Sequence, residues 1–143
     1  MSKLPTIARL LFGFAFFVFG LNGFLQFLPQ PPLTGAPAAF VGALVASGYF
    51  FPLLKGTEVV AGALLLGNRF VPLALALLAP IVVNIFAFHA FVAGSGMGLP
   101  IVLVALQLYL AYAYRNAFAP MLAAQVAPAA SDSHPAVAVA PAE

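Results

Sequence analysis

Cysteine is absent from the 143-residue chain, and only 6% of its side chains are charged. The lack of thiols excludes disulfides, thiolate catalysis, iron–sulfur clusters held by thiolates and zinc–thiolate sites within the chain. A soluble domain carries about 25% charged residues, so this chain has too few to coat a water-facing surface. The five basic residues form no cluster in the sequence, and we therefore expect no nucleic-acid partner.

Acidic and imidazole side chains are also scarce. Two of the three acids, Asp132 and Glu143, lie in the C-terminal tail, which leaves Glu58 as the one acid of the hydrophobic body. His134 also lies in the tail, so the body keeps a single histidine. One histidine cannot supply both axial imidazoles of a haem or build a multi-histidine site, and we expect no metal site.

Long hydrophobic runs take the place of charge, and 64% of the residues are hydrophobic. A membrane-spanning helix needs about 20 apolar residues. Four such runs cover residues 7–28, 52–67, 70–92 and 100–118. We therefore predict an all-α, polytopic integral membrane protein in which residues 1–120 form a four-helix bundle. The first run is too long for the core of a cleaved signal peptide, so we interpret it as the first span.

Two further segments do not have the length or pattern of a span. Residues 38–51 are apolar but few for a span, and they contain Gly42 and Gly48. We predict a short re-entrant or interfacial helix there, and the alternative is a fifth span. Residues 121–143 are rich in alanine and proline and show no periodicity, so we predict a disordered tail.

The basic residues indicate the orientation. With four spans, Lys3, Arg9, Arg69 and Arg115 all fall on one side of the membrane, and Lys55 alone falls on the other. Cytoplasmic loops carry an excess of basic residues, so this side is predicted to be the cytoplasm, with both termini and the tail there. Five spans would separate the first two of these residues from the other two.

The polar residues of the predicted spans fall at similar depths. At a rise of 1.5 Å per residue, they lie in the outer half of the bilayer. An ionisable residue inside a membrane is costly unless it is paired or hydrated, so Glu58 is a candidate functional residue, and Lys55 at i−3 could pair with it. We predict an outward-facing binding pocket that contains Glu58, His89, Asn84, Asn22, Gln107 and Lys55.

A structural role for the same residues is the alternative. Asparagine, glutamine and histidine commonly hydrogen-bond across membrane helices, and each such bond contributes about 0.6 kcal/mol. A Glu58–Lys55 pair could likewise be structural. A carboxylate is not needed for such a role, which favours a function for Glu58.

Five motifs carry a resemblance to a known family. They are RLLFG at 9–13, FGLNG at 19–23, GTEVVAGALLLG at 56–67, VNIFAFH at 83–89 and YRNAFAP at 114–120. In their order and spacing the chain resembles the DoxX family of small bacterial membrane proteins over about residues 7–120. Many relatives carry a lysine soon after the first-helix glycine, where this chain has Asn22 and Gly23.

The resemblance implies a four-helix bundle in the bacterial cytoplasmic (inner) membrane. Some relatives are named as the small subunit of a thiosulfate:quinone oxidoreductase, and others are linked to membrane redox complexes. The expected function is a non-autonomous subunit of a quinone-linked or sulfur-related redox system, with a membrane or soluble redox protein as partner. The expected cofactor is a non-covalent quinone, since an acid and a histidine beside an apolar pocket could hydrogen-bond its carbonyls.

Two other functions stay open on the sequence. The chain could be a structural or assembly protein without chemistry of its own, in a homo-oligomer or with another protein. It could also be a small transporter of a lipid, an isoprenoid or protons. Transport of protons is the least favoured, because the predicted inner half of the bundle lacks polar residues to complete a path.

Overall fold

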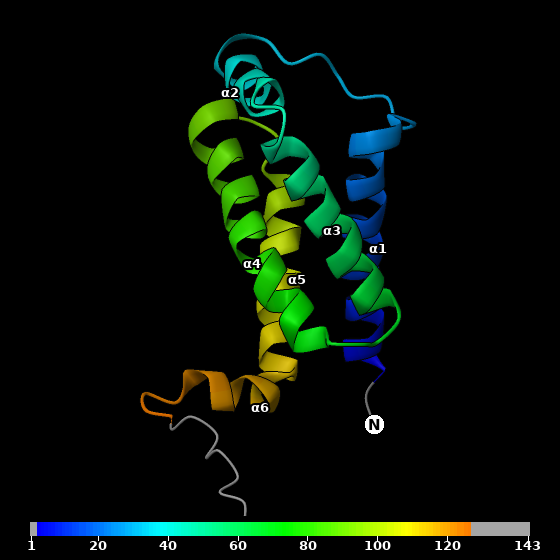
Figure 1. Ribbon diagram of the computed structural model, residues 1–143, viewed down its shortest axis with the longest axis vertical. Coiled ribbons are helices and arrows are strands. Elements are labelled where there is room, and N and C mark those ends of the chain that lie inside the picture. The colour runs from blue at the N-terminus through cyan, green and yellow to red at the C-terminus, as the bar shows by residue number, and fades with distance from the viewer. Residues whose placement is uncertain (1–2, 127–143) are drawn as a thin grey trace, which may run out of the picture.

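The computed structural model describes residues 3–126, and their regular structure is entirely helical. The elements are α1 (Leu4–Leu25), α2 (Gly35–Ala46), α3 (Phe50–Leu66), α4 (Val71–Ala87), the π-helix η1 (Phe88–Ala93), α5 (Gly98–Ala113), α6 (Arg115–Phe118) and the 3-10 helix η2 (Ala119–Leu122). In Figure 1, α1, α3, α4 and α5 run along the long axis, while α2 lies across the upper end and α6 across the lower end. The all-α prediction is confirmed.

Two helical segments are long and apolar enough to cross a membrane, Leu4–Leu25 and Val71–Ala93. Two bent pairs of helices also meet this criterion when each is counted as one segment. These are Gly35–Ala46 with Phe50–Leu66, bent by 89°, and Gly98–Ala113 with Arg115–Leu122, bent by 76°. Between two and four segments could therefore span a bilayer, which is consistent with a membrane protein.

The first helix begins and ends earlier than the predicted range of residues 7–28. It starts at Leu4, and Pro5 lies in its first turn, where a missing N–H costs no helical hydrogen bond. It ends at Leu25, because Gln26 adopts the left-handed conformation with φ 50°. The side-chain oxygen of Asn22 then accepts a hydrogen bond from the backbone N–H of Leu28 at 2.6 Å, which fixes the path of the chain out of the helix.

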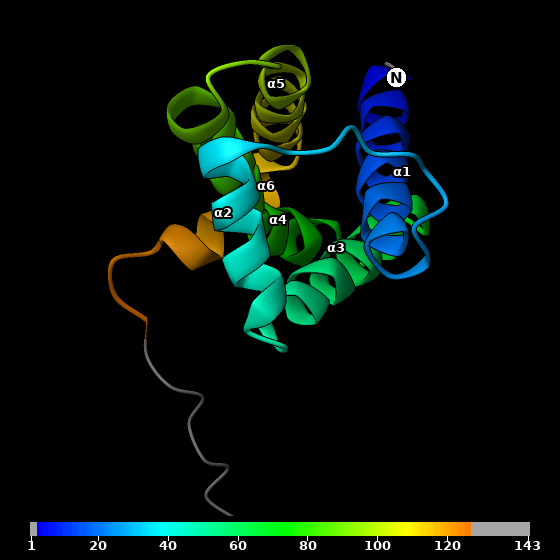
Figure 2. The same ribbon diagram turned by 90° about the horizontal axis from the view of Figure 1, so that it is seen from above.

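The short helix predicted at residues 38–51 is α2, which also begins and ends earlier than expected. Gly48, with φ +74°, makes the turn that separates α2 from α3. The hydroxyl of Ser47 accepts a hydrogen bond from the N–H of Phe50 at 3.2 Å and so satisfies an amide at the start of α3. The sharp turn leaves α2 lying over α4–η1 and beside the start of α3, as the view from above in Figure 2 shows.

The last predicted span, residues 100–118, is not one straight helix. Helix α5 ends at Ala113, Tyr114 departs from helical geometry with φ −101° and ψ 15°, and α6 follows in a new direction. At this bend the Nη1 atom of Arg115 donates to the carbonyl of Tyr112 at 3.0 Å, which satisfies a carbonyl at the helix end. Helix η2 extends into the range predicted to be disordered, and residues 127–143 of that tail lie outside the described part.

Helices α1 and α3 pack with their backbones in close contact. A Cβ atom on Gly62 would lie 2.5 Å from the backbone nitrogen of Phe17, and one on Gly13 would lie 2.8 Å from the Cβ of Leu65. Small residues let membrane helices approach in this way. The buried core below the α2 end includes Phe12 and Phe16, whose rings meet edge to face at 5.0 Å.

Arg9 fixes the lower end of the same pair of helices. Its side chain is only 6% exposed, and its Nη1 atom donates to the carbonyls of Leu65 and, at 3.4 Å, Leu66. These carbonyls belong to the end of α3, where a helix has unsatisfied acceptors and a partial negative charge. Arg9 is therefore a buried cap of α3, a role that was not predicted from the sequence, where Arg9 served only to indicate orientation.

Candidate functional site

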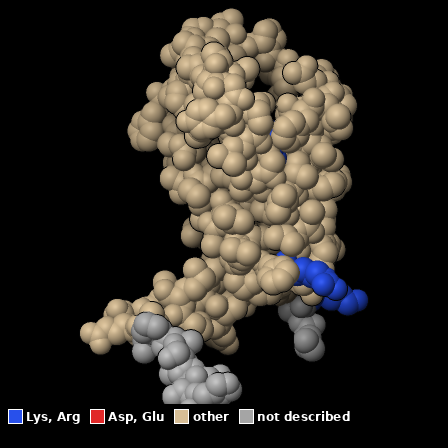
Figure 3. All heavy atoms as spheres, in the orientation of Figure 1, with Lys and Arg blue, Asp and Glu red and all other residues tan. Residues whose placement is uncertain are grey.

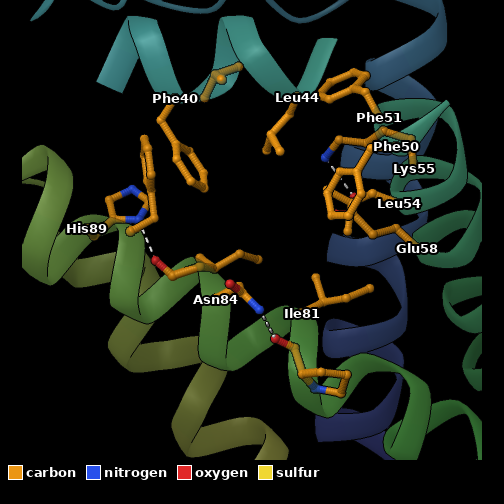
Figure 4. A pocket seen from close by; sticks show the side chains of 14 residues that line it. Phe40, Leu44, Phe50, Phe51, Leu54, Lys55, Glu58, Ile81, Asn84 and His89 are labelled. Atoms are coloured by element: carbon orange, nitrogen blue, oxygen red, sulfur yellow. Dashed lines mark hydrogen bonds and ion pairs between the residues drawn. The ribbon is translucent and has the colours of Figure 1, made fainter. Parts of the chain in front are cut away.

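A cavity of about 480 Å³ lies beneath α2, between α3 and the α4–η1 helix (Figure 4). Helix α2 forms its roof, and the two longer helices form facing walls. The lining residues are Phe40, Val41 and Leu44 from α2, Phe50, Phe51, Leu54, Lys55 and Glu58 from α3, and Pro80, Ile81, Asn84, Ile85, Phe88 and His89 from α4 and η1. The size falls within the range of ordinary small-molecule sites, about 300–1,000 Å³.

An ion pair forms the polar part of the α3 wall. The Nζ atom of Lys55 lies 2.8 Å from one carboxylate oxygen of Glu58, and the two side chains are 18% and 3% exposed. Lys55 also lies over the ring of Phe51, with its Nζ atom 5.6 Å from the ring centroid. The second oxygen of Glu58 has no hydrogen-bond partner among residues 3–126, so one acceptor remains available at the cavity.

Glycines on α1 give this ion pair its position. A Cβ on Gly23 would lie 2.4 Å from Cγ and 2.5 Å from Cδ of Lys55, so the stem of the lysine occupies the space that a side chain there would need. A Cβ on Gly20 would lie 3.0 Å from the Cβ of Glu58. The sequence indicated the lysine and the acid as site residues and Gly20 as a close-packing position, but it did not place either glycine against the ion pair. Their i, i+3 spacing, which places both on one face of α1, is the signal that could have found them.

His89 lies on the opposite wall, in the π-helix that follows α4. Its Nδ1 atom is 2.8 Å from the carbonyl of Ile85. A carbonyl only accepts, so Nδ1 carries the hydrogen, and in the neutral imidazole Nε2 is then an acceptor. The ring packs edge-on against Phe88 at 5.3 Å, and Phe88 packs against Phe40 of the roof at 5.6 Å. The π-helix was not predicted, and such wide turns recur at functional sites.

Asn84 lies on the same wall, about one turn before His89. Its Nδ2 atom donates to the carbonyl of Pro80 at 3.0 Å. The side-chain oxygen has no partner within the described part of the chain and is free to accept a hydrogen bond. In Figure 4, Asn84 lies between the ion pair on one side and His89 on the other.

Two of the six predicted pocket residues do not line this cavity. Asn22 is bonded to the chain just after α1, and Gln107 donates through Nε2 to the carbonyl of Leu75 at 2.9 Å. Leu75 lies near the start of α4, toward the end of the molecule opposite α2. The arrangement of these two side chains fits the alternative interpretation, in which polar residues hold segments of a bundle together.

The remaining four predicted residues, Lys55, Glu58, Asn84 and His89, line one cavity. Among residues 3–126 there is no group of three or more His, Cys, Asp or Glu side chains that could hold a metal ion. The cavity instead offers an ammonium donor, a carboxylate oxygen, an imidazole nitrogen and an amide oxygen within apolar walls. The paired charges cancel, so this environment fits a neutral, largely apolar molecule with polar groups on its edge.

Comparison with known proteins adds no relative. No family model matches the chain, and neither the curated proteins nor the solved structures gave a match. The resemblance to the DoxX family therefore stays a prediction.

Proposed function

We propose that this chain is a four-span protein of the bacterial inner membrane that binds a quinone as a non-autonomous subunit of a quinone-linked or sulfur-related redox system. The observation that carries the proposal is the cavity beneath α2, where the Lys55–Glu58 pair faces Asn84 and His89 across apolar walls. A quinone ring is apolar on both faces and has oxygens at opposite edges. The ammonium of Lys55 can donate to a carbonyl oxygen of the oxidised ring. The acceptors of Glu58, Asn84 and His89 match the hydroxyls of the reduced quinol.

The position of the cavity supports entry from the lipid phase. Figure 3 shows the molecule hollowed in its upper half, with part of a basic side chain visible deep between uncharged atoms. Lys55 is the basic residue that lines the cavity. Apolar residues that line the cavity are exposed, among them Phe40 at 45% and Phe50 at 38%. A lipid-soluble ring could enter between α3 and α4 while its tail stays in the bilayer.

The proposed topology follows from the two bent segments and the charges. Counting each bent pair as one span supports four spans. In the proposed orientation the α2 roof is at the outer surface and both termini are on the cytoplasmic side. Lys3, Arg69 and Arg115 then lie at the cytoplasmic end, as basic residues near spans usually do. Labelling of single introduced cysteines tests this topology, since the chain has no cysteine of its own.

The subunit role follows from the redox centres that the chain lacks the ligands to hold. The chain has no cysteine and only one histidine outside the tail, so it does not hold an iron–sulfur cluster through thiolates or a haem through two imidazoles. Electrons would therefore reach a bound quinone from the cofactor of a partner protein. In this role the chain positions the ring: the hydroxyls of the reduced quinol donate to the carboxylate of Glu58 and to Nε2 of His89, and the ammonium of Lys55 can donate to a carbonyl oxygen of the oxidised quinone.

The test is retention of ubiquinone or menaquinone through purification of the full chain. We expect the wild type to retain quinone and both Glu58→Gln and His89→Ala to retain severalfold less. Thr57→Val is the matched control, because Thr57 precedes Glu58 on α3, bonds only to Leu53 of its own helix and does not line the cavity. Equal retention by all four proteins would remove the quinone site from this cavity.

A structural role is the second candidate, and one observation favours it. The Lys55 stem fills the space above Gly23, so the ion pair also joins α3 to α1. If joining the two helices were the only role of the ion pair, Glu58→Gln would lower the stability of the bundle and leave quinone retention per folded molecule unchanged. Measuring retention and thermal stability on the same preparations separates the two functions.

A further inference from the structure

The end of the molecule opposite α2 combines exposed basic and exposed apolar side chains. We call it the basic end and define it by Lys3, Arg69 and Arg115, which precede α1, follow α3 and begin α6, and all of which are exposed. Blue atoms gather at the lower edge of the molecule in Figure 3. Glu58, the one acid within residues 3–126, lines the cavity near the other end. No carboxylate of the described chain therefore neutralises the basic end.

Apolar side chains project beside these charges. Phe70, in the turn that contains Arg69, has φ 49° and is 68% exposed. Met121 and Leu122 in η2 are 67% and 80% exposed. Large apolar groups this exposed next to basic residues are typical of segments that lie in the interfacial layer of a membrane.

The segment formed by α6 and η2 has the orientation that a segment in the interfacial layer requires. It turns by 76° from α5 and lies across the lower end of the molecule (Figure 1). Tyr114 and Phe118 pack against the core and so hold it in place. A segment fixed in this way runs roughly parallel to the membrane surface, with Met121 and Leu122 free to enter the lipid.

Arg115 is held at the bend in a defined position. Its guanidinium carbon lies 4.4 Å from the centroid of the Tyr112 ring, and its Nη1 atom donates to the Tyr112 carbonyl at 3.0 Å. The remaining N–H groups of this side chain have no bond within residues 3–126. Their charge and fork geometry suit the phosphate oxygens of a lipid.

We propose that the basic end binds the head groups of anionic phospholipids, with Arg69 and Arg115 contacting phosphate while Phe70, Met121 and Leu122 enter the acyl boundary. The adjoining apolar residues favour a lipid over a free anion, because a soluble phosphate would leave them in water. This site is separate from the cavity and does not depend on what the cavity binds. It does depend on the chain lying in a membrane.

The test measures lipid retention by the full chain in native mass spectrometry, from mixed micelles with equal phosphatidylglycerol and phosphatidylcholine. We expect the wild type to retain phosphatidylglycerol preferentially. Each basic residue near a membrane surface strengthens binding to anionic lipid roughly fivefold, so Arg69→Gln/Arg115→Gln should lose roughly five- to twentyfold of the preference. Arg69→Lys/Arg115→Lys is the matched control and should keep most of it.

Two further measurements on the wild-type protein vary the ionic strength and add free phosphate. Retention of phosphatidylglycerol should fall from 0.1 M to 1 M salt, since the screening length shortens from about 10 Å to about 3 Å. Phosphatidylglycerol vesicles, but not inorganic phosphate, should raise the thermal midpoint relative to phosphatidylcholine vesicles. Equal retention of both lipids by the wild type would overturn the proposal, as would equal stabilisation by inorganic phosphate.

Discussion

The stem of Lys55 crosses α1 at Gly23 so closely that a methyl group there would lie 2.4 Å from the lysine Cγ atom. The same lysine pairs with Glu58 at 2.8 Å. Gly23 thus sets the position of the cavity's ion pair from a different helix. Two segments far apart in sequence, one containing Asn22 and Gly23 and one containing Lys55 and Glu58, form a single structural unit.

Gly23→Ala should weaken ligand binding more than it weakens the fold. The lysine stem is flexible and can move aside, but it then leaves Glu58. We expect a stability loss of about 1 kcal/mol, at the low end for overpacking, together with severalfold lower quinone retention. Gly56→Ala is the control, because a Cβ there meets nothing within 4 Å, and it should keep both properties. Unchanged quinone retention in Gly23→Ala would show that the position of Lys55 does not affect binding in the cavity.

Gly62→Ala should damage the fold itself. The added Cβ would meet the backbone nitrogen of Phe17 at 2.5 Å, and backbone atoms cannot move aside as a lysine stem can. We expect α1 and α3 to separate locally, at a cost of about 1–3 kcal/mol in the free energy of unfolding. Denaturant titration in detergent, with Gly42→Ala as the unhindered comparison, measures the difference. Similar stability for both variants would contradict the close packing of α1 on α3.

Arg9→Met should destabilise the bundle although Arg9 does not line the cavity. The variant leaves the carbonyls of Leu65 and Leu66 without their charged donor, and hydrogen bonds to charged groups contribute about 1.5–3 kcal/mol. Arg69→Met is the control, because Arg69 is exposed, and its effect in neutral detergent should stay within about 0.5 kcal/mol. Equal unfolding midpoints for the two variants would exclude the capping role.

The ion pair should show coupling in a double-mutant cycle. Glu58→Gln leaves Lys55 without its partner, and Lys55→Met leaves the nearly buried carboxylate without its own. The double variant removes both charges, so we expect it to be less destabilised than the sum of the single variants by about 0.5–3 kcal/mol. Thermal unfolding of the wild type, the two single variants and the double variant in one detergent gives this coupling free energy. Strict additivity would mean that the two side chains do not interact in the protein.

The sequence predicted the helices and the main polar residues because both depend on local composition. Apolar runs marked the segments α1, α3, α4 and α5, and the cost of a charge in an apolar region pointed to Glu58. Lys55 followed from its i−3 spacing. His89 and Asn84 were placed at similar depth by the rise of a helix alone. These are the four predicted residues that line the cavity.

The sequence did not reveal features that depend on contacts between distant segments. Asn22 has the same composition signal as Asn84, yet it bonds to Leu28 after its own helix and not to the cavity. Arg9 resembles an interfacial residue in the sequence. However, it lies three, four and seven residues before Phe12, Gly13 and Phe16, on the buried face of α1. That helical periodicity could have placed its side chain inside the bundle.

The π-helix and the bend at Tyr114 were also not predicted from the sequence, whereas the break between α2 and α3 was expected, a few residues later than it occurs. The π-helix at Phe88–Ala93, which contains His89, has no distinctive residue type to mark it in the sequence. Tyr114 ends α5 within a continuous apolar run, where composition suggests no boundary. Positions of this kind depend on which neighbouring helix the chain packs against next.

The central claim is that a quinone occupies the cavity beneath α2. Photolabelling with a photoreactive ubiquinone analogue tests it most directly, in membranes that contain the full chain, with labelled residues located by mass spectrometry. We expect labels on cavity residues such as Phe40, Leu44 and Phe88, and we expect excess ubiquinone to suppress them. Labels spread over the exposed apolar surface, at Leu108 or Val83 for example, and unaffected by the competitor would contradict the account.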